Sequence, residues 1–498
     1  MKKLLAILLF SLAFTPVYII RAQSGVDNPR ILQMDLSATE LAHFMAPGWN
    51  LGNTMEACNS NHIFTNKAGV GSETSWQGSK TTQQFISLLK EKGFNSVRIP
   101  CGWVAGHIAD KETMKIDEAW MNRVKEIIDY CLNANLYVVI NDHWDGGWLE
   151  YDGFTDKANV SEKKKQLRLL WTNIANALKD YDERVLFAGL NEPGVGGASP
   201  QAVGSKLDSN GSAFANRLLE YEQVFIDAVR ATGGKNANRV LIVQAPETNI
   251  DKAYSNTFDV SLLKDSAKDR LMVEVHFYDP YTFTLMKNDE SWGKVALYWK
   301  GHGPSGNWDR TCNTIWYNNS NVDANKYLQD MMNKLKTKFV NKGYPVIIGE
   351  YAASRKNAGQ YAGDQEKHNE SITYWYSQVT GLAMKSGVVP FVWDTNYRGY
   401  PHEAVFNRSS VTIDDSYIYQ GLHEGSLDGI TQFQNIYPRP SETSTSIKEV
   451  SYLKENNTKK EPVYSLDGRL VSMPVADITT LSLAAGIYLF GSRKIVIK

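Results

Sequence analysis

Residues Val346–Tyr351 read Val-Ile-Ile-Gly-Glu-Tyr, an apolar run that ends close to a glutamate. Residues Tyr137–Asp142 read Tyr-Val-Val-Ile-Asn-Asp and have the same form. Apolar runs without polar alternation are typical of parallel strands that are buried on both faces. Parallel strands must be joined by long crossover connections, which are usually helices. The two runs therefore predict an α/β fold, with polar residues gathered where the strands end.

The rest of the chain repeats this alternation of strand-like and helix-like runs. Thr81–Lys92 begins at threonines and stops before a glycine, whereas Asp117–Asn135 and Lys326–Lys342 each carry an apolar stripe. Eight strands alternating with helices predict a (β/α)₈ TIM barrel. A doubly wound open sheet is the alternative, although no Gly-x-Gly-x-x-Gly motif follows the first strand. The predicted strands are Gly48–Thr54, Ser96–Pro100, Tyr137–Asp142, Val185–Glu192, Val240–Thr248, Met272–Asp279, Val346–Tyr351 and Val388–Thr395.

Two glutamates mark the ends of predicted strands. Glu192 ends the fourth strand in Leu-Asn-Glu-Pro, and Glu350 ends the seventh in Ile-Gly-Glu-Tyr. In a barrel, residues at these ends face the active-site side. A lone buried glutamate near a strand end more often forms a salt bridge, but two carboxyl groups across one cleft are what cleavage of a glycosidic bond requires. The pair therefore favours glycoside hydrolysis, in which one group protonates the leaving oxygen and the other attacks the sugar or activates water.

Polar residues at other strand ends support this interpretation. Arg98 is embedded in apolar residues, so its charge needs a partner, and a nucleophilic carboxylate is a suitable one because the arginine keeps it ionised. His143 follows the third strand, and His276 and Tyr278 share one face of the sixth by strand alternation. Each histidine alone is more often structural, but together they predict substrate-positioning groups. The aspartates beside His143 suggest a metal, but no His-His spacing supports one, and we predict neither a metal nor a cofactor.

Five motifs in this order resemble glycoside hydrolase family five. They are Gly48–Thr54 (Gly-Trp-Asn-Leu-Gly-Asn-Thr), Val97–Pro100, Leu190–Pro193, His276–Tyr278 and Gly349-Glu350. The resemblance covers roughly residues 30–440. The form of the first motif and of the central loops is most similar to subfamily four, and in particular to endoglucanases of gut Bacteroidetes of the Prevotella type.

The resemblance implies a retaining barrel hydrolase in which Glu192 is the acid/base and Glu350 the nucleophile. It also implies that Asn191 bonds the sugar 2-hydroxyl and that Trp393 lies beneath the sugar. The family's paired histidines after the third strand are His143 and Trp144 here, so Trp144 would supply stacking instead. We expect the two carboxyl groups to stand ~5–5.5 Å apart, because a separation near ~9 Å would indicate inversion. The substrate-binding residues predicted in this way are Arg98, His143, Asn191, His276, Tyr278, Trp393, Trp144, Trp148 and Asn50.

The chain contains 13 tryptophans, and all of them lie between Trp49 and Trp393. The candidates for stacking on sugar rings are Trp103, Trp144, Trp148 and Trp299, which follow predicted strands. Those expected in the core are Trp49, Trp120, Trp171 and Trp375. We predict an endo-β-1,4-glucanase that binds cellulose-type chains and mixed-linkage β-glucan, with xyloglucan as a further candidate. The alternatives are an endo-mannanase or xylanase of the same barrel group and a non-catalytic glycan-binding surface protein. With 53 basic and 54 acidic residues, nothing indicates nucleic acid as a partner.

The two ends of the chain differ from its centre. Residues 1–22 place two lysines before an apolar run, which predicts a secretory signal peptide. We expect the catalytic domain over residues 23–440, a polar linker over 441–458 and a short β tail over 459–498 that ends in a hairpin.

The tail resembles the C-terminal sorting domain of the type IX secretion route. That resemblance implies secretion machinery as a partner and a secreted or cell-surface enzyme, with the periplasm as an intermediate location. A leftover β module without a role and a carbohydrate-binding module are the alternatives. We expect a monomer, and four scattered cysteines predict no disulfide framework, although one bridge through Cys58 or Cys312 stays open.

Overall fold

A computed structural model describes residues 34–194, 207–208, 210–305 and 308–440, and four strands near the C-terminus at 461–465, 470–475, 486–490 and 493–497. The chain forms two compact units, residues 1–440 and 441–498, and each is described by itself. The predicted signal peptide (1–22) and linker (441–458) lie outside the described residues. No helix in the described part of the chain is long and apolar enough to cross a membrane.

Eight strands close into a barrel in which every neighbouring pair is parallel. The last strand, β14, pairs back onto the first, β1. The barrel confirms the predicted fold and rules out the open sheet. All eight strands fall on the predicted runs, although the fourth ends at Ala188 and leaves Glu192 on the loop beyond it. The barrel strands are Gly48–Asn50 (β1), Ser96–Ile99 (β2), Tyr137–Asn141 (β5), Val185–Ala188 (β6), Leu241–Gln244 (β7), Leu271–Phe277 (β8), Val346–Tyr351 (β13) and Val388–Val392 (β14).

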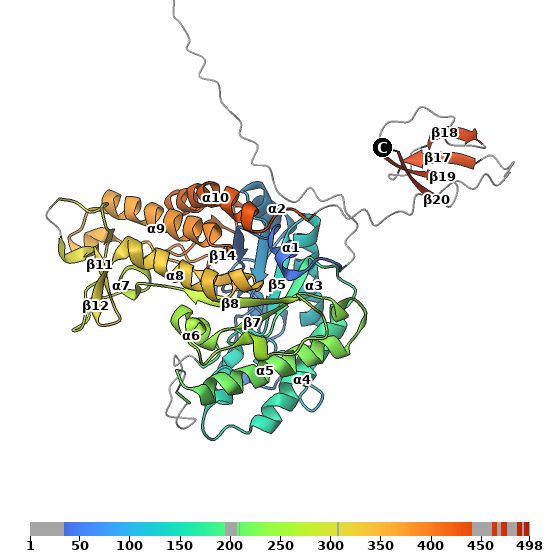
Figure 1. Ribbon diagram of the computed structural model, residues 1–498, viewed down its shortest axis with the longest axis horizontal. Helices are drawn as coiled ribbons and strands as arrows, with labels where there is room; N and C mark the ends of the chain where they lie inside the picture. Colours follow the sequence, from blue (N-terminus) through green and yellow to red (C-terminus); the bar gives the residue numbers. More distant parts are fainter. Residues whose placement is uncertain are drawn as a thin grey trace, which may run out of the picture. The chain divides into compact units, whose positions relative to one another are not determined.

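Helices connect the barrel strands and surround them. Asp117 caps α3 by accepting the backbone N–H of Trp120, and Asp323 caps α8 in the same way. The last two helices, α9 and α10, run side by side (Figure 1). The helices are Ala38–Ala42 (α1), Gln83–Glu91 (α2), Glu118–Asn133 (α3), Val160–Ala177 (α4), Ser212–Ala231 (α5), Ile250–Tyr254 (α6), Tyr281–Thr284 (α7), Ala324–Lys338 (α8), Gln365–Lys385 (α9) and Ser416–Ile436 (α10).

The floor of the barrel is closed by apolar residues. Alternate residues of the strands, such as Val139 and Ile242, form one buried cluster with Leu41 and Phe44 from α1 and the turn after it. The residues between them, such as Val138 and Val243, belong to the cluster that includes the surrounding helices. Because the amino-terminal end of the barrel is filled in this way, a ligand reaches it from the carboxyl ends of the strands.

The loops around the barrel contain short two-stranded sheets. Trp299 lies in one of these sheets and is buried against Phe283. The sheets pair Ile108–Asp110 (β3) with Lys115–Ile116 (β4), Tyr298–Trp299 (β9) with Thr311–Cys312 (β10), Thr314–Tyr317 (β11) with Ser320–Asp323 (β12), and Phe406–Asn407 (β15) with Thr412–Ile413 (β16). All four cysteines are free thiols, so the bridge left open through Cys58 or Cys312 is absent from the described structure.

The second unit contains a four-stranded antiparallel sheet in the order β18, β17, β19, β20. Its strands are Glu461–Ser465 (β17), Leu470–Val475 (β18), Gly486–Phe490 (β19) and Arg493–Ile497 (β20). The pairing of β19 with β20 confirms the predicted final hairpin.

Candidate active site

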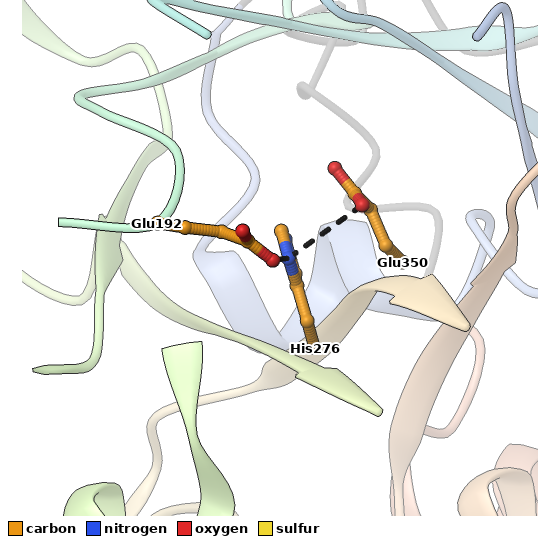
Figure 2. Close-up of side chains that lie close together, drawn as sticks. All are labelled: Glu192, His276 and Glu350. Atoms are coloured by element: carbon orange, nitrogen blue, oxygen red, sulfur yellow. Dashed lines mark hydrogen bonds and ion pairs between the residues drawn. The ribbon is translucent and has the colours of Figure 1, made fainter. Parts of the chain in front are cut away.

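The carboxyl ends of the barrel strands bring Glu192, His276 and Glu350 together (Figure 2). One carboxylate oxygen of each glutamate and a ring nitrogen of the histidine lie within 4.8 Å of one another. The histidine Nδ1 lies 2.7 Å from Glu192 Oε1 and 3.7 Å from Glu350 Oε2. Two carboxyl groups from strands far apart in sequence thus face each other across the mouth of the barrel.

Glu350 points into this mouth because of a bulge in β13. Ile348 pairs with Val275 of β8, but the next pair is Glu350 with His276, so Gly349 is an extra residue. Without the bulge, strand alternation would turn Glu350 to the outside of the barrel. Glycine is required here, because a Cβ at position 349 would lie 1.9 Å from Oε1 of Glu274.

Arg98 fixes the carboxylate of Glu350 in place. Its guanidinium donates to Glu350 Oε1 at 2.9 Å and to Asn191 Oδ1 at 2.9 Å, and it forms an ion pair with Glu274 at 2.9 Å. Tyr278 donates its hydroxyl to the other oxygen of Glu350 at 2.8 Å. Burial and the charge of Glu350 raise the pKa of Tyr278 well above its usual value, so the phenol keeps its proton and remains a donor. Both oxygens of Glu350 therefore accept hydrogen bonds, which hold the carboxylate in one orientation.

His276 is positively charged in this surrounding. Burial lowers its pKa, but Glu350, Glu192 and Glu274 outweigh that effect and raise the pKa to about 10. Its Nδ1–H donates to Glu192, and its Nε2–H donates to Glu274 at 3.3 Å. Glu274 is fully buried, and although burial alone would raise its pKa, Arg98 and His276 lower it. The charged histidine thus connects the Glu192 side of the site to a fixed carboxylate below it.

His143, Trp393 and Trp144 line the other parts of the mouth. The rings of His143 and Trp393 lie nearly parallel at 5.8 Å, and Trp393 is half-buried. Burial, Arg98 and His276 hold the pKa of His143 well below its usual value, so this histidine is neutral. Trp144 is also half-buried and makes an edge contact with Tyr151. These rings keep exposed surface, as sugar-contacting groups must.

Other predicted substrate-binding residues do not reach the cleft. Asn50 is fully buried and donates to the carbonyl oxygens of Gly349, Phe391 and Val392. Arg98 is also 0% exposed, so it acts on Glu350 and not on the sugar. The assignment of both residues to substrate binding is corrected: they hold the strand ends in position.

Three of the four tryptophans predicted to stack on sugar are core residues. Trp148 is 1% exposed, and its ring contacts Phe64 while its Nε1–H donates to Asp142 at 3.2 Å. Trp103 and Trp299 are both fully buried. The loops that carry them fold back onto the barrel. A tryptophan that follows a strand in the sequence is therefore not necessarily exposed at the mouth. The core assignments of Trp49, Trp120, Trp171 and Trp375 agree with their full burial.

Three residues of the site escaped the sequence reasoning. Glu274 lies two residues before His276 on the same face of β8, and this spacing was a usable signal. Gln244 of β7 donates to Glu274 at 2.6 Å and accepts the N–H of Leu190 at 2.7 Å. Glu150 accepts the backbone N–H of Glu192 at 2.9 Å, a contact that no spacing predicts.

A cavity of about 480 Å³ lies beside the mouth, on the loops that follow β1 and β14. Its wall includes the exposed rings of Trp76 and Tyr397, with Asn53, Lys287 and Glu403 among its polar groups. The cavity adjoins Trp393, because Gly52, next to Asn53, lies against the Trp393 ring. No motif or spacing pointed to Trp76.

In the described part of the chain, Glu192, His276 and Glu350 form the cluster whose ligand atoms lie close enough together to hold a metal ion. A metal would have to displace the proton from Nδ1 of His276, which the pKa of about 10 opposes. The aspartates beside His143 have another role, since Asp145 accepts the backbone N–H groups of Trp103, Val104 and Ala105. Asp145 thus fixes the fold of the loop after Cys101.

A closed (β/α)₈ barrel with two glutamates facing each other at its carboxyl-terminal mouth is the arrangement of a glycoside hydrolase. Comparison with protein families agrees, because the model of the cellulase family (glycosyl hydrolase family 5) matches residues 61–399, which include both glutamates. The chain belongs to glycosyl hydrolase family 5 and is a glycoside hydrolase.

Its relatives are endoglucanases. A xyloglucan-specific endo-β-1,4-glucanase of Bacteroides ovatus is 34% identical over 391 residues, which cover 74% of this chain and 69% of that protein. The structure of a family-5 xyloglucan-specific β-1,4-glucanase from a ruminal metagenomic library, in complex with XXLG, matches with a TM-score of 0.67 at 38% identity and covers 79% of this chain and 97% of that one. A GH5-4 broad specificity endoglucanase from Bacteroides salanitronis matches with a TM-score of 0.64 at 30% identity and covers 80% and 98% of the two chains. These relatives support endo-β-1,4-glucanase activity.

Proposed function

We propose that the protein is a retaining endo-β-1,4-glucanase of subfamily four, with Glu192 as acid/base and Glu350 as nucleophile. The observation that carries this proposal is the approach of the two carboxylates to within 4.8 Å across the mouth. Retaining enzymes hold their carboxyl groups ~5–5.5 Å apart, whereas inverting enzymes need ~6.5–9.5 Å to admit a water. The close approach of one oxygen from each carboxylate supports the retaining mechanism.

The proposed reaction has two steps. Glu192 donates its proton to the glycosidic oxygen while Glu350 attacks the anomeric carbon, so the leaving sugar departs as an alcohol and a glycosyl ester forms. Glu192, now ionised, takes a proton from water, and the water oxygen displaces Glu350 from the anomeric carbon. Arg98 and Tyr278 hold Glu350 for attack. Asn191, oriented by Arg98, is placed to bond the sugar 2-hydroxyl, and Trp393 lies beneath the ring.

We propose β-1,4-linked glucans as substrates, including mixed-linkage β-glucan and xyloglucan. The cavity on the loops after β1 and β14 supports branched chains, because its volume of about 480 Å³ falls within the range of ligand pockets and offers room beside the backbone. Two relatives are described as xyloglucan-specific, and a third as a broad specificity endoglucanase. Trp76 and Tyr397 are the stacking groups that the chain offers there.

A polysaccharide panel tests the proposal. The wild type should release reducing ends and internal fragments from carboxymethylcellulose, mixed-linkage β-glucan and xyloglucan, with the β-anomer as first product by NMR. Glu350→Ala should lose turnover on all three. Normal turnover by this variant, or an α-anomer as first product, would overturn the mechanism. Preferential action on mannan or xylan would favour the other enzymes of the barrel group, and binding without hydrolysis would favour a glycan-capture protein.

We further propose that the enzyme is exported and acts outside the cytoplasm as a monomer. The n-region and apolar run of residues 1–22 and the resemblance of residues 459–498 to a sorting tail support export. Deletion of residues 441–498 tests the role of the tail. Loss of activity from the culture fluid and cell surface, with activity retained inside the cell, is the expected result, and unchanged export would remove the sorting hypothesis.

A further inference from the structure

Glu274 lies inside the barrel below the mouth and takes no part in the proposed reaction. Strand alternation puts it on the same face of β8 as His276, two residues deeper, and it is 0% exposed. Its Oε1 lies 2.9 Å from Nε of Arg98 and 3.3 Å from Nε2 of His276. Its Oε2 accepts the side-chain N–H of Gln244 at 2.6 Å. Three nitrogen atoms thus converge on one buried carboxyl group.

The first route from Glu274 to the acid/base passes through the ring of His276. Glu274 is ionised, because Arg98 pairs with it at 2.9 Å. An ionised carboxylate only accepts hydrogen bonds, so the ring nitrogen that faces it, Nε2, carries hydrogen. The other ring nitrogen, Nδ1, lies 2.7 Å from Oε1 of Glu192 (Figure 2). The bond at Nε2 prevents the ring from flipping, so Nδ1 stays against Glu192.

The second route passes through Gln244, which pairs with Glu274 in the register of β7 and β8. Its Nε2–H donates to Glu274, and its Oε1 accepts the backbone N–H of Leu190 at 2.7 Å. Only this orientation of the amide satisfies both partners, because a flipped amide would place its NH₂ group against the N–H of Leu190. Leu190 lies two residues before Glu192. Gln244 therefore ties the loop that carries the acid/base to the same buried carboxylate.

We propose that Glu274 is a positioning residue for the acid/base, Glu192, and acts through the two side chains that it holds. The ring of His276 fixes the carboxyl group of Glu192, and the amide of Gln244 fixes the loop beneath it. This inference rests on the proposed role of Glu192. The fixed ring gives the two carboxyl oxygens different tasks, because Oε1 receives the hydrogen bond of His276 and Oε2 is left to carry the proton for the glycosidic oxygen. A carboxyl group that turned freely would present this proton in fewer of its orientations.

The replacement Glu274→Gln breaks this arrangement with little change in shape. Both oxygens of Glu274 face nitrogen atoms, whereas glutamine replaces one of the two acceptors by an NH₂ donor. In one orientation that donor faces the amide of Gln244, and in the other it faces the ring of His276. The nucleophile is affected less, because Arg98 still donates to Glu350 at 2.9 Å through a different nitrogen atom.

Two aryl β-cellotriosides distinguish the acid/base from the rest of the site. The phenyl glycoside needs a proton from Glu192 to be cleaved, whereas dinitrophenolate leaves without one, and kcat/KM reports only the steps up to the glycosyl ester. Catalysis by a positioned acid is worth about 10²–10⁴-fold. Glu274→Gln should therefore lower kcat/KM at least about tenfold on the phenyl glycoside and less than about threefold on the dinitrophenyl glycoside. Equal losses on the two substrates, or no loss on either, would overturn the inference.

Glu73 offers a matched control away from the site. It is 2% exposed, pairs with Arg123 at 2.7 Å and accepts the backbone N–H of Thr81 at 2.7 Å. Glu73→Gln also takes a buried carboxylate from an arginine, so it measures what the loss of such a pair does to the fold. The ratio of the phenyl to the dinitrophenyl kcat/KM should keep its wild-type value in this variant. A ratio that falls as in Glu274→Gln would show that loss of stability alone has this effect, and would overturn the specific role of Glu274.

Two measurements do not depend on the folding of Glu274→Gln. Gln244→Met leaves Glu274 in place but cuts the second route, and it should also lower kcat/KM more on the phenyl than on the dinitrophenyl glycoside. In the wild type at neutral pH, heteronuclear NMR of the ring of His276 should show hydrogen on Nε2. Equal losses in Gln244→Met, or an Nε2 without hydrogen, would overturn the inference.

Glu192→Ala separates this inference from the proposed function. It should lose kcat/KM on the phenyl glycoside far more than on the dinitrophenyl glycoside, because only the first needs the acid. If it shows no such preference, the proposed role of Glu192 fails. If it does, and the ratio of the two kcat/KM values is unchanged in Glu274→Gln, the role of Glu274 alone is overturned.

Discussion

Replacement of Arg98 by methionine should lower the free energy of unfolding more than any surface substitution, because it leaves two buried carboxylates without their cation. Methionine fills a similar volume but carries no charge, so Glu274 and Glu350 lose a cation that lies 2.9 Å from each. Removing one partner of a buried ion pair costs about 3–5 kcal/mol. Since whole domains are stable by only about 5–15 kcal/mol, urea denaturation at pH 7 will measure this loss easily.

The loss of stability in Arg98→Met should also depend on pH, and the structure predicts the direction of that dependence. Arg98 and His276 lower the pKa of Glu274 from its ordinary 4.5, so its ionised form contributes stability that is present above pH 4.5 and lost as pH falls below it. In the variant that contribution is missing, and protonation relieves the stranded charges. The difference in unfolding free energy between wild type and Arg98→Met should therefore be largest near pH 7 and shrink towards pH 4.5.

Arg239 provides the control. It is also 0% exposed, but it donates to neutral acceptors, namely backbone carbonyl oxygens and Asn236 Oδ1. Arg239→Met should lose stability by an amount that stays constant between pH 4.5 and 7. A loss below about 1 kcal/mol in Arg98→Met, or one that does not change with pH, would refute the reasoning about stranded carboxylates.

Three more predictions follow from the site. Gly349→Ala should destabilise the fold by about 1–3 kcal/mol and lower kcat, because its Cβ would meet Glu274 Oε1 at 1.9 Å; a variant with wild-type melting temperature and kcat would contradict this. The pKa of His276 is raised from 6.5 to about 10, so the stability that its charge contributes is complete below pH 6.5 and lost as pH rises through 10. The unfolding free energy of the wild type should therefore fall across that window by at most about 1.4 kcal/mol per pH unit. It should fall more steeply than that of His276→Gln. Trp393→Ala should lower kcat/KM with little change in melting temperature, whereas Trp148→Ala should lower the free energy of unfolding by about 3–5 kcal/mol. Activity and thermal-melt assays of both variants check this. The reverse pattern would mean that the roles of the two rings are misassigned.

The barrel was predictable because parallel strands that are buried on both faces consist almost entirely of apolar residues. Val346–Ile348 and Tyr137–Ile140 are apolar without interruption, as parallel strands that are buried on both faces require. The approach of Glu192 to Glu350 was also predictable, because residues that follow the strands of a barrel all lie at its carboxyl-terminal end. Strand limits were less certain: the predicted fourth strand ran on to Glu192, whereas the paired strand ends at Ala188.

Side-chain direction was the part that sequence could not supply. Strict alternation along β13 would turn Glu350 outward, and the bulge that brings it inward is visible only in the pairing of β13 with β8. The same limit explains the tryptophans: Trp148 and Trp299 follow strands as the half-buried Trp144 does, but each loop folds back and finds a core partner. The unpaired charge of Arg98 predicted one carboxylate partner, and the structure provides two, Glu350 and Glu274.

The contacts of Arg98 have a consequence for folding kinetics. From β2, its guanidinium bonds Asn50 of β1, Asn191 after β6, Glu274 of β8 and Glu350 of β13. These strands span the circumference of the ring, so the guanidinium finds all its partners only when the ring has closed. A chain that has formed its early strands and helices but not the β1–β14 seam therefore lacks an ordered nucleophile. Regain of hydrolytic activity during refolding should report the closing of the barrel, and it should lag behind the return of helical signal.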